Sequence, residues 1–311
     1  MAKPAHSLPL ALALTLALLA PARAHASAAR AARAATAAAG YDEAAARRFV
    51  GLSAAAYCPR AQVEAWTCRP CGGAPALTRV AYLDNETSAI VGYVGLAAAA
   101  TPPEVVVAFR GSEGALDWLE DFDITQVPAN ATLPPGAAAC AGCLLSRGFS
   151  VDTYRTVRAQ LLAAVRATLA AAGPGATVVV TGHSLGGALA EVAALDLLAE
   201  GLPVSASYTF GTPRVGNAAW AAAWAAAAEA AMPGAHFRVV HALDPVPRLP
   251  PAVLLGYAHP PREVWYNNAS SSFAVCSATN GEDASCSDSD VPLEARDHTF
   301  YLNVTLGEAS C

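Results

Sequence analysis

Two hydrophobic patterns alternate along the chain: short runs of apolar and β-branched residues, and longer segments whose apolar residues recur at helical spacing. The short runs predict strands over residues 89–96, 105–109, 177–181, 207–210 and 237–243. The longer segments predict helices over residues 149–172, 184–198 and 218–231. Strands that alternate with helices are typical of an α/β domain with a mostly parallel central sheet, whose strand ends offer loops for chemistry.

The first 26 residues have a different pattern, a basic start followed by one short apolar run. Lys3 precedes the apolar residues 8–20, and the small-residue sequence Ala24-His25-Ala26 follows them. This pattern predicts a signal peptide over residues 1–26, and an N-terminal membrane anchor is the alternative. No other apolar run approaches the length of a spanning helix. We therefore expect a secreted, extracellular chain without a transmembrane segment.

The rest of the chain predicts one domain. Residues 27–40 are almost all alanine and are interpreted as a linker or propeptide. Residues 41–311 contain neither an internal repeat nor a central linker, and their length suits a single domain with a large core. The formal charge of the whole chain is −6, and loss of Lys3 and Arg23 with the signal peptide would make it −8. An acidic chain argues against nucleic acid as a partner.

Eight cysteines, an even number, indicate folding in an oxidising compartment. Cys68 with Cys71 and Cys140 with Cys143 have C-x-x-C spacing, so the four thiols could also form a zinc site. In an exported chain disulfides are the favoured interpretation, and we predict no metal. Four N-x-S/T sequons predict glycosylation on the same route, at Asn85, Asn130, Asn268 and Asn303.

The predicted strand 177–181 leads into a G-x-S-x-G sequence, Gly182-His183-Ser184-Leu185-Gly186, and a helical pattern follows. A tight strand-to-helix turn of this kind exposes the serine oxygen, because the two glycines let strand and helix pass closely. Ser184 is therefore the candidate nucleophile. A glycine-rich turn with an incidental serine is the alternative.

A serine hydroxyl needs a base to remove its proton, and in this fold an orienting acid and then a histidine follow the nucleophile in the chain. Asp244 directly follows the predicted strand 237–243 and precedes a proline-rich segment, a suitable place for an orienting acid. His259 and His298 both follow Asp244, and chain order does not separate them. The rival acids lie in a Ser-rich loop or in the helix after the serine: Asp283, Asp288, Asp290 and Asp196.

Acyl transfer also needs hydrogen-bond donors aimed at the developing oxyanion. The backbone amide of Leu185, at the start of the predicted helix, is one candidate. Ser112 is the second, because it lies in the loop that follows the predicted strand 105–109. An ordinary helix cap is the alternative role for Ser112, and the two roles are compatible.

Together these motifs resemble the fungal-type class 3 lipases, the family that includes the Rhizomucor and Thermomyces lipases and the related feruloyl esterases. The resemblance implies an α/β-hydrolase fold with a short helical lid. It also implies that His298, rather than His259, completes a triad with Ser184 and Asp244. It covers nearly all of the mature chain and rests on Tyr57-Cys58, Trp66-Thr67-Cys68-x-x-Cys71, Phe109-Arg110-Gly111-Ser112, Arg147-Gly148-Phe149, residues 182–187, residues 211–216, Asp244-Pro245-Val246-Pro247, Asp297-His298 and Cys311.

The same resemblance implies further site residues. Ser112 and Leu185 match the oxyanion-hole pair of these lipases. Residues 113–121 match their lid, which would swing aside at a lipid surface, and a fixed surface helix is the alternative. The predicted apolar lid residues are Leu116, Trp118 and Leu119. The family pattern also implies disulfides between Cys58 and Cys311, Cys68 and Cys71, and Cys276 and Cys286; Cys140 and Cys143 lie outside it, and we predict a fourth, local bridge between them.

These inferences predict a secreted serine lipase that hydrolyses long-chain acylglycerols through an acyl-enzyme. It would need no metal and no organic cofactor, and we expect a monomer that adsorbs peripherally to a lipid–water interface. A feruloyl, phospholipid or galactolipid esterase is the alternative within the enzymes, because pocket shape rather than the triad decides substrate choice. An inactive hydrolase-like binding glycoprotein is the alternative outside them.

Overall fold

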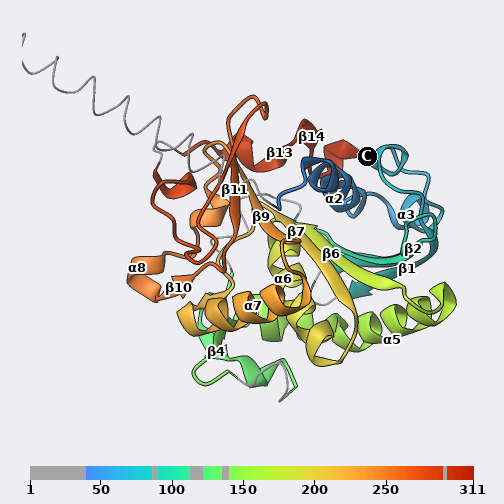
Figure 1. Cartoon of the computed structure of the whole chain (residues 1–311), viewed down its shortest axis with the longest axis horizontal. Helices are drawn as coiled ribbons and strands as arrows, with labels where there is room; N and C mark the ends of the chain where they lie inside the picture. The colour runs from blue at the N-terminus through green and yellow to red at the C-terminus, as the bar shows by residue number, and fades with distance from the viewer. Residues whose placement is uncertain (1–39, 86–87, 89, 113–121, 135–139, 290–292) are drawn as a thin grey trace, which may run out of the picture.

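The computed structural model describes residues 40–85, 88, 90–112, 122–134, 140–289 and 293–311 (Figure 1). The predicted signal peptide lies outside these residues, as do the predicted lid residues Leu116, Trp118 and Leu119. Among the helices that the described residues form, none combines the length and the hydrophobicity needed to cross a bilayer.

A central sheet of eight strands organises the chain (Figure 1). Its five middle strands are mutually parallel, while the two at one edge and the one at the other edge pair antiparallel. The prediction of a mostly parallel α/β sheet is confirmed. In order across the sheet the strands are β1 (Thr78–Asn85), β2 (Ile90–Ala97), β3 (Glu104–Phe109), β6 (Thr177–His183), β7 (Val204–Phe210), β9 (His236–His241), β11 (Glu263–Tyr266) and β12 (Phe273–Val275).

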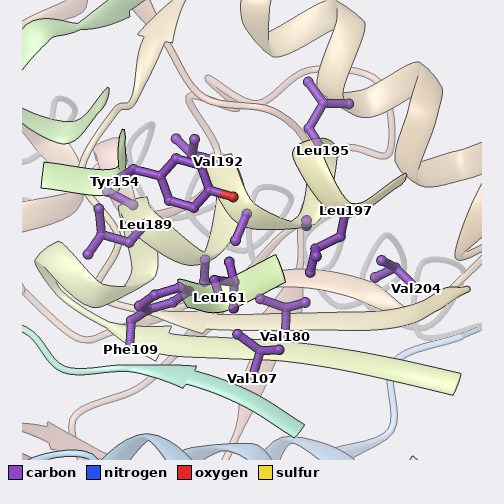
Figure 2. Close-up of a cluster of buried hydrophobic side chains, with 14 of the residues drawn as sticks. Val107, Phe109, Tyr154, Leu161, Val180, Leu189, Val192, Leu195, Leu197 and Val204 are labelled. Carbon is purple, nitrogen blue, oxygen red and sulfur yellow. The ribbon is translucent and has the colours of Figure 1, made fainter. Parts of the chain in front are cut away.

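Helices cover both faces of this sheet (Figure 1). Because side chains alternate along a strand, Val179 of β6 packs in the cluster of α2, with Phe49. Its neighbour Val180 packs on the other face with Leu161 of α5 and Leu189 of α6 (Figure 2). The helices are α2 (Glu43–Ala55), α3 (Arg60–Glu64), α5 (Arg155–Ala172), α6 (Leu185–Ala199), α7 (Ala218–Ala231) and α8 (Ala252–Leu255).

Smaller elements complete the described part of the chain. A second sheet, of four strands, consists of β10 (Tyr257–Ala258), β8 (Gly216–Asn217), β5 (Leu144–Ser146) and β4 (Gln126–Pro128). A hairpin near the C-terminus consists of β13 (Phe300–Tyr301) and β14 (Val304–Thr305). Short 3-10 turns span Pro70–Gly73, Ala129–Ala131, Val246–Arg248, Ser287–Ser289, Ala295–Thr299 and Glu308–Ser310.

Most predicted elements differ from the structure by a residue or more at one or both ends, and the strand expected at 207–210 begins earlier, at Val204. Two differences have a clear physical reason. The strand expected at 237–243 ends at His241, because Ala242 has a φ of 42° and turns the chain. Two residues therefore separate Asp244 from the strand. The helix expected at 149–172 begins as a π-helical segment, Gly148–Tyr154, in which the Thr153 hydroxyl donates to the Gly148 carbonyl at 2.7 Å. A side-chain bond to a carbonyl of the preceding turn accompanies this wider winding.

All eight cysteines form disulfides, and the four pairs are those that the sequence predicts. The bond between Cys58 and Cys311 ties the end of α2 to the C-terminal residue, across a separation of 253 residues. The other bonds pin local loops and pair Cys68 with Cys71, Cys140 with Cys143, and Cys276 with Cys286. Neither C-x-x-C pair has a free thiol, so the alternative of a four-thiolate zinc site is wrong for this structure.

Candidate active site

Ser184 lies in the tight turn between β6 and α6. Its φ of 59° and ψ of −127° are an unusual conformation for a residue with a side chain. The turn is possible because glycines flank it. A Cβ atom at Gly182 would lie 2.2 Å from the Gly186 carbonyl oxygen, and one at Gly186 would lie 2.3 Å from the Phe109 carbonyl oxygen. The Ser184 amide also donates to the Phe210 carbonyl at 2.9 Å, which fixes the turn to β7.

His298, the predicted base, links this serine to the predicted acid Asp244. Its Nε2 lies 2.8 Å from Ser184 Oγ, and its Nδ1 lies 2.9 Å from Asp244 Oδ2. All three side chains are buried. Because an ionised carboxylate only accepts, Nδ1–H donates to Asp244 and the free Nε2 can accept the serine proton. This is the geometry of a Ser-His-Asp triad.

The rival residues lie in other environments. His259 is buried with its Nε2 2.7 Å from the Pro247 carbonyl oxygen. Asp196, in α6, accepts hydrogen bonds from Arg158 and from the Tyr154 hydroxyl. Both residues therefore have structural partners of their own, and the Ser184 hydroxyl instead contacts His298.

Asp244 is held by more than its histidine. The Val246 amide donates to Oδ1 at 2.8 Å, and the Tyr301 hydroxyl donates to Oδ2. Burial alone would raise the pKa of this carboxyl, but the charge of His298 and the hydrogen bonds from His298 and Tyr301 lower the pKa below its ordinary value. The carboxylate is thus kept ionised inside the protein, as an orienting acid requires.

A second buried network lies behind the triad. The Gly111 amide donates to the Tyr57 hydroxyl at 3.1 Å, and that hydroxyl lies 2.7 Å from His183 Nδ1. The other ring nitrogen of His183 lies 2.7 Å from the His298 carbonyl oxygen. Burial and the nearby charge of His298 lower the pKa of His183 to about 3. His183 is therefore neutral and links the loop after β3 to the backbone of His298.

The predicted oxyanion donors lie close to the nucleophile. Leu185 is the first residue of α6, so its amide has no acceptor within the helix. A Cβ atom built at Gly111 would lie 2.9 Å from Ser184 Cβ, which places the loop that carries Ser112 beside the nucleophile. Ser112 itself is half-buried. The predicted lid helix would occupy residues 113–121, which lie outside the described part of the chain.

Known proteins match both the sequence and the fold. A family model for class 3 lipases matches residues 106–254. A lipase of Rhizomucor miehei is 33% identical over 269 residues, which cover 83% of this chain and 68% of the relative. The chain belongs to the class 3 lipase family.

Other relatives of this class 3 lipase chain match different shares of its length. The secreted mono- and diacylglycerol lipase 1 of Fusarium solani is 41% identical over 162 residues, which cover 52% of this chain and 44% of the relative. The chain thus spans less than half the length of that relative. The solved structure of lipase II from Rhizopus niveus has a TM-score of 0.74 and 28% identity, and the match covers 86% of this chain and 98% of that one. The predicted α/β-hydrolase fold is confirmed by this similarity.

Other candidate ligands and modification sites in this class 3 lipase chain lie apart from the triad. Among the described residues, Glu263, Cys276 and Cys286 come close enough together to hold a metal, but the two cysteines are joined in a disulfide. Of the four predicted glycosylation sites, Asn85 is half-buried, and the exposed ones are Asn130, Asn268 and Asn303. Glycosylation stays a prediction.

Sequence reasoning missed three side chains of this class 3 lipase site. Tyr57 was noticed only as part of a family motif, and His183 only as the variable residue of G-x-S-x-G. Tyr301 follows His298 by three residues, a spacing that could have suggested a shared turn. Its contact with Asp244, however, depends on where the hairpin of β13 and β14 folds back, which the residue pattern does not show.

Proposed function

We propose that this chain is a secreted serine carboxyl-ester hydrolase that acts on acylglycerols. The observation that carries the proposal is the buried line of hydrogen bonds from Ser184 through His298 to Asp244, with spacings of 2.8 Å and 2.9 Å. In this arrangement the histidine can remove the proton of the weakly nucleophilic serine hydroxyl at neutral pH. Membership of the class 3 lipase family supports an ester of a lipid as substrate.

The proposed reaction has two halves. Ser184 Oγ attacks the ester carbonyl carbon while His298 Nε2 takes the hydroxyl proton, and the resulting oxyanion accepts bonds from the Ser112 and Leu185 amides. Collapse breaks the carbon–oxygen ester bond, and His298 returns the proton to the leaving alcohol. Water, activated by the same histidine, then hydrolyses the acyl-enzyme and releases the carboxylic acid. His298 accepts and returns the proton in each half of the reaction, so no metal or organic cofactor enters the proposal.

The surface around the site supports a lipid interface as the partner. Among the described residues, five large apolar side chains are exposed: Ile124, Val253, Leu254, Leu255 and Leu293. All lie in or beside the segment 243–257, which carries Asp244. The Tyr257 hydroxyl donates to the Ile124 carbonyl, Gln126 donates to the Leu255 carbonyl, and the Glu294 amide donates to the Leu243 carbonyl. An apolar rim of this kind suits peripheral adsorption by a monomer.

The proposal is tested by hydrolysis of tributyrin from below to above its solubility limit, with wild-type protein and Ser184→Ala. We expect the wild-type rate to rise sharply above the limit. Ser184→Ala should lose activity by about 10⁴-fold or more, because only binding and oxyanion stabilisation remain. An unchanged melting temperature of the variant would show that the loss is chemical.

Substrate choice is tested on the same preparation with trioleoylglycerol, mono-oleoylglycerol and ethyl ferulate. Because the Fusarium solani relative is named a mono- and diacylglycerol lipase, we expect this chain to hydrolyse the partial glyceride mono-oleoylglycerol. Faster hydrolysis of the ferulate would overturn the lipase assignment in favour of a feruloyl esterase. A wild-type chain that neither hydrolyses any of these esters nor reacts with a serine-directed phosphonate would be an inactive binding protein.

A further inference from the structure

Helix α6 carries a buried carboxyl group on the side of the sheet away from α2. Glu191 is only 1% exposed, yet neither of its carboxyl oxygens has a hydrogen-bond partner among the described residues. The helix is fixed at this point by its backbone, since Trp224 of α7 donates its indole N–H to the Glu191 carbonyl at 2.9 Å. Burial of a carboxyl group without hydrogen-bond partners costs free energy.

The sheet opposite this carboxyl is also polar. Tyr208 and Phe210 of β7 pack on the α2 face, so Ser207 and Thr209, which alternate with them, point to the face of α6 and α7. Both hydroxyls are buried and lack a partner among the described residues. Thr209 is the register partner of Arg238 in β9, so these two side chains lie next to each other on that face.

Arg238 is only partly satisfied. Its Nε donates to the Pro260 carbonyl at 2.9 Å, and its Nη2 donates to the Gly281 carbonyl at 3.1 Å and lies 3.5 Å from Glu263 Oε2. Its Nη1 is buried with no partner in the described part of the chain. The positive charge acts on Glu191, where it opposes the effect of burial on the carboxyl. Arg238 and Glu191 therefore face the same interior region, and neither has used all of its hydrogen-bonding groups.

Thr212 extends this region toward the triad. A Cβ atom at Gly187 would lie 2.5 Å from Thr212 Oγ1, and Gly187 is one turn before Glu191 on the same side of α6. The Thr212 hydroxyl is also buried without a partner among the described residues. A Cβ atom on the preceding residue, Gly211, would lie 2.9 Å from Asp244 Oδ2. The polar region thus begins directly behind the orienting acid.

We propose that α6, β7 and β9 enclose an internal site that binds ordered water, which bridges Glu191 to Nη1 of Arg238 and to the hydroxyls of Ser207, Thr209 and Thr212. Buried water of this kind needs two to four polar partners, and this region supplies both donors and acceptors. A metal cation does not fit because the Arg238 guanidinium faces the same space.

The protonation state of Glu191 agrees with a water site. Burial, partly opposed by Arg238, raises the pKa of its carboxyl to about 8. At neutral pH the group is therefore mostly protonated, and one oxygen donates a hydrogen bond while the other accepts one. Water can meet both needs at once.

The first test is Thr209→Val, which keeps the side-chain shape but removes the hydroxyl. If the hydroxyl binds water, the variant loses a hydrogen bond and its melting temperature falls by about 2 °C or more. If the region is dry, removal of an unsatisfied buried hydroxyl raises the melting temperature, and the proposal is overturned. The matched control is Thr181→Val in β6. The Thr181 hydroxyl already donates to the Tyr208 carbonyl at 2.7 Å, so its removal should lower the melting temperature in either case.

The second test is a crystal structure of the whole chain at about 1.5 Å resolution. The proposal expects solvent density within hydrogen-bonding distance of both Glu191 and Nη1 of Arg238. A direct contact between the carboxyl and the guanidinium, with no solvent between them, would overturn it. Neither test depends on hydrolytic activity, so the outcome is separate from that of the proposed function.

Discussion

Tyr301 shows how much a single hydroxyl contributes to the candidate site. It donates to Asp244 Oδ2 from the hairpin that follows His298, and both groups are buried. A hydrogen bond to a buried charge contributes about 1.5–3 kcal/mol. The bond both helps to hold the carboxylate in its orientation and helps to keep its pKa low. Tyr301 is therefore a positioning residue, because it acts on the reaction through Asp244.

Tyr301→Phe should lower kcat for ester hydrolysis by about tenfold or more and leave KM nearly unchanged, since binding of the ester does not involve the hydroxyl. The measurement is steady-state kinetics on a soluble short-chain ester. Tyr93→Phe is the matched control, because its buried hydroxyl donates at 2.8 Å to the Leu52 carbonyl, outside the triad. A kcat equal in both variants would contradict the positioning role.

Residues that belong to a chemical motif could be predicted at this scale, and residues that only support them could not. Ser184 is predictable because its turn requires glycines on both sides, and Asp244 because it follows a predicted strand and precedes a proline-rich segment. Order left His259 and His298 open, and only the family resemblance separated them. Tyr57 contacts His183 across 126 residues and Tyr301 contacts Asp244 across 57 residues, and no local pattern encodes such contacts.

At the scale of elements, the middle of the sheet could be predicted and its edges could not. The central strands β3 and β6 contain continuous valine runs because helices bury both of their faces. The edge strand β1 has the sequence Thr-Arg-Val-Ala-Tyr-Leu-Asp-Asn and is mostly half-exposed, so it lacks this signal. Strands β11 and β12 are only four and three residues long, too short for a periodic pattern. Their places are set by pairing with β9 and with each other.

Helix α8 presents apolar side chains to solvent. Val253 is 97% exposed and Leu254 is 83% exposed, although both are strongly apolar. The tip is nevertheless fixed, because the Gly256 amide donates to the Ala252 carbonyl at 2.8 Å and Gln126 donates to the Leu255 carbonyl at 2.8 Å. A fixed apolar tip beside the segment that carries Asp244 fits insertion into a lipid surface, which the proposed function requires.

The double variant Val253→Ser with Leu254→Ser should therefore adsorb at least about tenfold more weakly to emulsified trioleoylglycerol. Burial of each of these side chains in lipid contributes about 1.5–3 kcal/mol. The measurement is the rate of hydrolysis as a function of interfacial area. The control is a soluble short-chain ester, on which the variant and the wild type should have equal kcat/KM. Equal activity on the emulsion would exclude α8 as an anchor.

At the scale of the whole molecule, the resemblance gave the architecture but not the polar interior. The disulfide between Cys58 and Cys311 closes a loop of nearly the whole described chain, and its pairing follows from the family pattern. The carboxyl of Glu191, by contrast, lies in a helix that is buried from Leu185 to Leu197 and contains one other acid, Asp196. The apolar neighbours of Glu191 favour a buried helix, but they do not show what its carboxyl faces. Its burial follows only from how α6 and α7 pack on the sheet.

That buried carboxyl makes the stability of the whole fold depend on pH. The pKa of Glu191 is about 8 in the folded chain because of burial, against an ordinary value of 4.5 that applies when the chain unfolds. Between these two values the folded state holds a proton that the unfolded state releases. The contribution of Glu191 is therefore fully present below pH 4.5 and is lost as the pH rises through 8. The loss has an upper limit of about 5 kcal/mol, at about 1.4 kcal/mol for each pH unit.

Glu191→Gln keeps the shape of the side chain and removes its titration, so the variant should not suffer this loss. We expect the free energy of unfolding of the variant, relative to wild type, to increase steadily from about pH 4.5 to pH 8 and then to stay constant. The measurement is urea unfolding at a series of pH values. Glu308→Gln, a substitution at an exposed position, should follow the wild-type curve. Parallel curves for Glu191→Gln and wild type would mean that Glu191 is already ionised in the folded chain near its ordinary pKa. Water in the proposed internal site would then have to solvate a carboxylate facing Arg238 rather than a neutral acid.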